Sequence, residues 1–269
     1  PNAQTKTQRD DFERDIRVLA EEFNHYRLFA DILESATGEP VRLEKLRAWQ
    51  LPEDKKLQQV RQWVRTEHGH VGEAAIGFTE GGGASFFFEG RKLSGDPIAE
   101  QIANACEIVF QDETEHGEHG ATELARELDT ETEWAKAREL VTAICQQRLR
   151  MRYEMFGLPI NEVRIREIAE GNIEPLRMHA TTSSKIEGLK QEIQALGQRF
   201  WAGEAEIARN FLTAGHPPED HVHWLRHQCY RELRGPGLLE RPHSRTQWLI
   251  DMVGEHLPVA ESKSGRHEL

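Results

Sequence analysis

The stretch IANACEIVFQDETEHGEHG (residues 102–120) decides the fold that we expect for this chain of 269 residues. Its apolar residues recur at spacings of three and four up to Val109, which is the periodicity of a helix with one buried face. The same stripe continues at steps of four and three through Glu113 and His116. A carboxylate and an imidazole are therefore predicted to project from this helix toward the core.

The same periodicity predicts helices along almost the whole chain. They cover about residues 8–35, 53–80, 97–124, 130–156, 161–170 and 183–213, followed by one after Pro218 and one at 244–256. Only the apolar run SFFFEG (85–90) has the composition of a strand. We therefore expect an all-α fold, with a helical bundle at residues 1–157 that carries the functional site. Residues 158–269 are expected to form a helical extension packed on this bundle as one integrated domain.

Composition argues against several classes of protein. The formal net charge of −12 argues against a nucleic-acid partner, since such proteins usually present a basic face. No apolar run approaches the roughly 20 residues that a membrane span needs, so no membrane partner is expected. The first residues are polar and lack the apolar centre of a signal peptide. Three widely spaced cysteines imply no disulfide framework, and we expect a cytoplasmic protein.

The pair of Glu113 and His116 has two counterparts on earlier predicted helices. Each is a Glu-x-x-His sequence, each continues an apolar stripe, and the glutamates follow one another at intervals of one helix and one connection. The three pairs are Glu22 with His25, Glu67 with His70, and Glu113 with His116.

This repetition favours a metal site. Residues three apart on a helix lie on the same face, one turn apart, so one helix can offer a carboxylate and an imidazole to the same ion. Carboxylates on facing helices can bridge two ions, and hard oxygen ligands with imidazole suit iron or manganese. A buried glutamate without a partner is costly. The alternative is that the pairs are ordinary polar contacts at helix surfaces.

At these residues the chain resembles the ferritin-like di-iron carboxylate proteins, in the segments EEFNHY (21–26), RTEHGH (65–70) and DETEHG (112–117). The family pattern takes one Glu from each of two helices and Glu-x-x-His from each of two others. The resemblance implies two iron ions, with manganese as the other candidate metal. The predicted helix at 130–156 has no carboxylate at the centre of its apolar face. Glu204, on the stripe of a later helix, is the candidate ligand in its place, and the alternative is that it is an edge glutamate of an amphipathic helix.

The function that the resemblance implies is a non-haem di-iron oxygenase or oxidase. Such an enzyme would activate O2 to oxidise a small organic substrate, with electrons from an external donor, and the helical extension makes a homodimer plausible. A peroxide-removing or iron-handling protein of the same architecture is the second reading. A metal-free helical interaction protein is the third.

The remaining polar residues of these segments are expected on the surface. Within the opening stretch these are Asp112, Glu115, Glu118 and His119. His223 and His227, four residues apart, could bind a metal but lack a third ligand and are likewise expected on the surface. In that helix Val222, Leu225 and Cys229 take the inward side.

Overall fold

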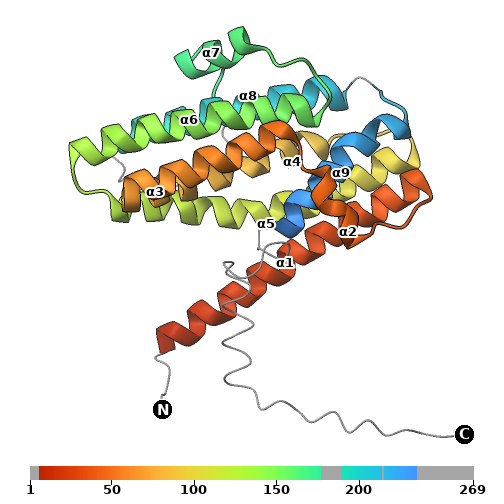
Figure 1. Ribbon diagram of the computed structural model, residues 1–269, viewed down its shortest axis with the longest axis horizontal. Coiled ribbons are helices and arrows are strands. Elements are labelled where there is room, and N and C mark those ends of the chain that lie inside the picture. The colour runs from red at the N-terminus through yellow and green to blue at the C-terminus, as the bar shows by residue number, and fades with distance from the viewer. Residues whose placement is uncertain (1–5, 177–188, 214, 235–269) are drawn as a thin grey trace, which may run out of the picture.

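The computed structural model describes residues 6–176, 189–213 and 215–234 (Figure 1). Side chains are not described for residues 114–127, although this segment is helical. The longer helices are α1 (Lys6–Thr37), α3 (Pro52–Glu80), α5 (Pro97–Glu127), α6 (Glu131–Met155), α8 (Leu189–Leu212) and α9 (Pro218–Arg234). Shorter ones are α2 (Leu43–Leu46), α4 (Ala84–Gly90) and α7 (Glu162–Glu170), with 3-10 turns η1 (Arg47–Trp49) and η2 (Gly81–Gly83). The expected all-α class is confirmed, since none of the described residues forms a strand.

Five of the described helices form a ring, and α1, α7 and α9 pack against it. Around the ring, α5 packs on α3, α3 on α6, α6 on α8, and α8 on α4, which returns to α5. Helix α1 packs on α5 and on α9, so that α1 and α9 lie side by side (Figure 1). The first and last described helices are therefore neighbours. None of the described helices has the length and apolarity required to cross a membrane.

The helix starts follow from the sequence. Asp96 caps α5, because its side chain accepts hydrogen bonds from the backbone N–H groups of Ile98 and Ala99, and Pro97 occupies the first turn. Thr130 and Glu133 form a reciprocal capping box at the start of α6.

Two expectations from the sequence require correction or lie beyond the described residues. The segment SFFFEG, expected as a strand, belongs to helix α4, with Phe86 and Phe87 buried. A short apolar run that is buried on several sides has no periodicity that separates strand from helix. The helix expected at 244–256 lies outside the described residues.

Helix α3 is interrupted at Gly69, and this interruption changes which residues face the core. Gly69 has a φ of 50° and a ψ of −130°, a conformation that residues with a side chain rarely adopt. Gly72 packs so closely on the Val64 carbonyl group that a Cβ atom there would collide with it. Val64 and Val71 stay buried on either side of the break, whereas Glu67 between them is exposed.

Candidate metal centre

Three side chains of the predicted site converge where α1 meets α5. Glu22 and His25 come from consecutive turns of α1, and Glu113 comes from α5. One potential ligand atom of each lies within 4.8 Å of the other two. His25 is fully buried, and both glutamates are partly buried. Two of the three Glu-x-x-His segments therefore contribute to a single location.

Asp112 fixes the orientation of the His25 ring. The Nε2 atom of His25 lies 2.9 Å from the Oδ2 atom of Asp112. Because an ionised carboxylate can only accept hydrogen bonds, Nε2 is the donor and carries the ring proton. In the neutral ring the Nδ1 atom then carries a lone pair, and this buried atom has no hydrogen-bond partner among the described residues. Histidines that bind metals are commonly oriented by a carboxylate in this way.

Helix α9 brings a further carboxylate to the same place. The Oε2 atom of Glu232 lies 3.8 Å from the Nδ1 atom of His25, and its other oxygen accepts a hydrogen bond from the Gln228 side chain. Burial raises the pKa of Glu232 above its ordinary value, although His25, Gln228, Arg231 and Glu22 oppose this effect.

This donor set fits a transition-metal ion. Carboxylate oxygens and one imidazole nitrogen are the ligands that iron and manganese accept readily. Two ligand atoms that bind one ion at about 2.1 Å lie about 3 Å apart when adjacent and about 4.2 Å apart when opposite. Separations of up to 4.8 Å among Glu22, His25 and Glu113 are close to this range. The buried lone pair of His25 Nδ1 gives an independent reason to place a cation here.

Glu204, expected as a ligand from a fourth helix, lies in a buried ion-pair triad. Its Oε1 atom is 3.0 Å from Arg148 Nη2, and its Oε2 atom is 2.8 Å from Arg152 Nε. Burial alone raises the pKa of Glu204, but the two guanidinium groups outweigh burial and hold the pKa below its ordinary value. Both carboxylate oxygens are thus occupied by arginines, and the geometry does not bring Glu204 into the group around His25.

Glu113 belongs to the group around His25 and also acts on the ion-pair triad of Glu204, Arg148 and Arg152. Burial alone lowers the pKa of Arg148, but Glu204, Cys145 and Glu113 together outweigh burial and raise it, with Glu113 the smallest contributor. The Oε2 atom of Glu113 also lies 3.5 Å from where a Cβ atom on Gly83 would be. The glycine turn η2 therefore forms part of the wall beside Glu113.

The second Glu-x-x-His segment lies on the surface. Glu67 and His70 flank the break at Gly69, and both are exposed. The Nε2 atom of His70 lies 3.0 Å from Glu133 Oε1, which ties α3 to the start of α6. The expected inward stripe assumed an unbroken helix, and Gly69 invalidates that assumption. The structure does not bring Glu67 and His70 together with Glu22, His25 and Glu113.

His116 lies in helix α5 one turn after Glu113, as expected, but its side chain is not among those described. The same holds for Glu115, Glu118 and His119.

Sequence reasoning missed two residues of this group. Asp112 was expected to be solvated, but it bonds to His25 from the edge of the α5 stripe. Glu232 continues the inward stripe of α9 three residues after Cys229, and that spacing is the signal that could have identified it. His227 was expected on the surface but is buried, because α9 packs on η1, where the His227 ring lies 3.2 Å from the Trp49 carbonyl oxygen.

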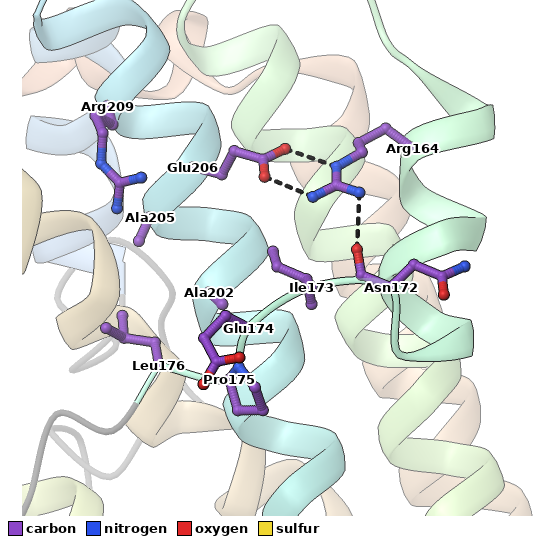
Figure 2. A pocket seen from close by; sticks show the side chains of 10 residues that line it. All are labelled: Arg164, Asn172, Ile173, Glu174, Pro175, Leu176, Ala202, Ala205, Glu206 and Arg209. Carbon is purple, nitrogen blue, oxygen red and sulfur yellow. Dashed lines mark hydrogen bonds and ion pairs between the residues drawn. The ribbon is translucent and has the colours of Figure 1, made fainter.

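A separate open pocket of about 530 Å³ lies beside α7 and α8 (Figure 2). The connection at residues 172–176 forms one wall, and α8 forms the other. Arg164 makes two hydrogen bonds to the Glu206 carboxylate and one to the Asn172 carbonyl oxygen. Arg209 is paired with Glu89. Both arginines are thus neutralised by glutamates, and none of the residues around His25 lines this pocket.

No family model matches the chain, and neither a curated protein nor a solved structure matches it.

Proposed function

We propose that this protein is a metal-dependent oxidoreductase that activates O2, with its metal held by Glu22, His25 and Glu113. The observation that carries the proposal is the convergence of these three side chains around a buried imidazole whose Nδ1 atom has no hydrogen-bond partner in the described part of the chain. Iron is the leading candidate and manganese the second, because the donors are mostly carboxylate oxygens.

The finer assignment is a ferritin-like di-iron oxygenase or oxidase that acts on a small organic molecule. Two features support it: Glu-x-x-His segments on two adjacent helices, and an additional carboxylate, Asp112, bonded to the same imidazole. When bound, the metal would supply O2 binding and reduction.

The residues of this chain have distinct tasks in the proposal. Glu22 and Glu113 would bind the metal ion and balance its positive charge. Asp112 accepts a hydrogen bond from His25 Nε2, so that Nδ1 is available as a ligand. Buried apolar residues of the adjoining helices, including Tyr26, Phe29 and Val109, keep water from this region.

Metal analysis tests the proposal directly. The purified chain is loaded anaerobically with Fe²⁺, desalted, and assayed for bound iron and for O2 consumption with a chemical reductant. We expect the wild-type chain to retain iron and to consume O2, and Glu113→Ala to lose most of both. Less than about half an equivalent of metal per chain, with no difference between the two proteins, would overturn the proposal. Two equivalents per chain would favour the di-iron assignment over a single ion.

A further inference from the structure

We propose that Glu232 of α9 is a further ligand of the metal, so that the centre is assembled from three helices, α1, α5 and α9. This inference rests on the proposed function, because it assigns one more ligand to the same centre. It also gives the C-terminal helix a direct part in the site.

The first argument is the position of the Glu232 carboxylate. Its Oε2 atom lies 3.8 Å from His25 Nδ1, the ring nitrogen that has no hydrogen-bond partner among the described residues. Gln228 holds the other oxygen, Oε1, and therefore fixes the rotation of the carboxylate. The oxygen that remains, Oε2, is the one that lies near His25 Nδ1.

The second argument is charge. A buried carboxylate needs a cationic partner. Glu204 has two arginines for this purpose, whereas no lysine or arginine forms an ion pair with Glu232 in the described part of the chain, where Arg231 acts on it only as a nearby charge. A divalent ion bound to Glu232 and to His25 Nδ1 would place a positive charge directly at this buried carboxylate.

The assignment has a consequence for α9 that a ligand set confined to α1 and α5 lacks. A metal bound to Glu232 ties α9 to α1 through bonds much stronger than the apolar packing between these helices. Metal binding should therefore slow amide hydrogen exchange across α9, residues 218–234. If Glu232 were only a buried structural residue, a folded Glu232→Gln variant with bound Fe²⁺ would show the same protection of α9 as the wild type.

The experiment compares the full-length wild-type chain with Glu232→Gln and with Glu219→Gln, a control at an exposed position of the same helix. Fe²⁺ affinity is measured anaerobically by equilibrium dialysis, and hydrogen exchange is followed by mass spectrometry with and without Fe²⁺. We expect Glu232→Gln to weaken Fe²⁺ binding roughly tenfold to hundredfold or more and to abolish the protection of α9. Glu219→Gln should match the wild type in both measurements.

The possible results separate the Glu232 assignment from the proposed function. Wild-type Fe²⁺ affinity in a folded Glu232→Gln variant would overturn the Glu232 assignment and leave the proposed function standing. The wild-type exchange measurement decides the matter if the variant does not fold. Bound Fe²⁺ that slows exchange in α9 no more than in α6, a helix without a proposed ligand, overturns the assignment, and a larger slowing in α9 supports it. A wild-type chain that binds no Fe²⁺ refutes the proposed function, and the assignment falls with it.

Discussion

Replacing Glu204 by glutamine should destabilise the protein strongly without weakening the proposed Fe²⁺ binding. Glu204, Arg148 and Arg152 are all buried, and the two carboxylate oxygens lie 2.8–3.1 Å from guanidinium nitrogens. Glutamine keeps the volume but loses the charge, and its amide NH2 group faces donors instead of accepting from them. The Arg152 guanidinium group then remains buried without its carboxylate partner, and Arg148 keeps only the weaker attraction of Glu113.

The expected magnitude follows from this geometry. Removing one member of a buried ion pair commonly costs about 3–5 kcal/mol, because an uncompensated charge is left behind. For a chain of this size, with a urea slope of about 3 kcal/mol per M, the unfolding midpoint falls by roughly 1 to 2 M. Glu206→Gln provides the matched control on the same helix. Its ion pair with Arg164 is partly exposed, so its loss should cost about 1 kcal/mol or less.

Urea unfolding of the metal-free proteins, followed by circular dichroism, measures both changes. The pH dependence adds a second test, since the pKa of Glu204 in the folded chain lies below its ordinary value of 4.5. Its ionised form therefore stabilises the fold above that value, and the contribution is lost as the pH falls through the folded-state pKa. The difference between wild type and Glu204→Gln should shrink below about pH 4.5. Equal effects of Glu204→Gln and Glu206→Gln, or loss of iron in folded Glu204→Gln, would refute the reasoning.

Three further predictions concern the site and its surroundings. Asp112→Asn should weaken Fe²⁺ binding about tenfold to hundredfold in equilibrium dialysis, because it removes the carboxylate that sets the His25 tautomer; an unchanged affinity would contradict that role. Gly82→Ala should lower the free energy of unfolding in urea by about 1–3 kcal/mol, since the added Cβ atom would lie 2.6 Å from Trp201 Nε1. An unchanged free energy would mean that the Trp201 side chain moves aside at little cost. His70→Ala should leave iron stoichiometry unchanged, because the ring is exposed and bonded to Glu133; lost iron would return His70 to the ligand set.

The sequence predicted helices and their faces well where the periodicity is continuous. Helix α5 begins at the expected proline, and its stripe places Glu113 where the pattern indicates. The same reasoning failed for Glu67, because a stripe assumes regular φ and ψ angles and Gly69 departs from them. The sequence His68-Gly69-His70 indicates an interruption at this point, since glycine at the centre of a helix is unfavourable.

The partners of the expected site residues could not be predicted, because they depend on packing between distant segments. Glu204 lies on the predicted apolar face, but only the fold shows that Arg148 and Arg152 meet it there. Periodicity indicates which side of a helix is buried and not which helix covers it. For that reason Glu232, which arrives from the last described helix, could not be connected with His25 from the sequence.

The pairing of α1 with α9 has a consequence for how the protein is made. About 200 residues separate His25 from Glu232 in the chain. At about 5–20 residues per second, translation takes roughly 10 to 40 seconds to cover that distance. Throughout this interval α1 has been synthesised, but α9, the helix on which it mainly packs, has not. Acquisition of iron at a centre completed by α9 would therefore be an event of the finished polypeptide, and a transcript that stops before α9 would yield a chain lacking part of its cofactor site.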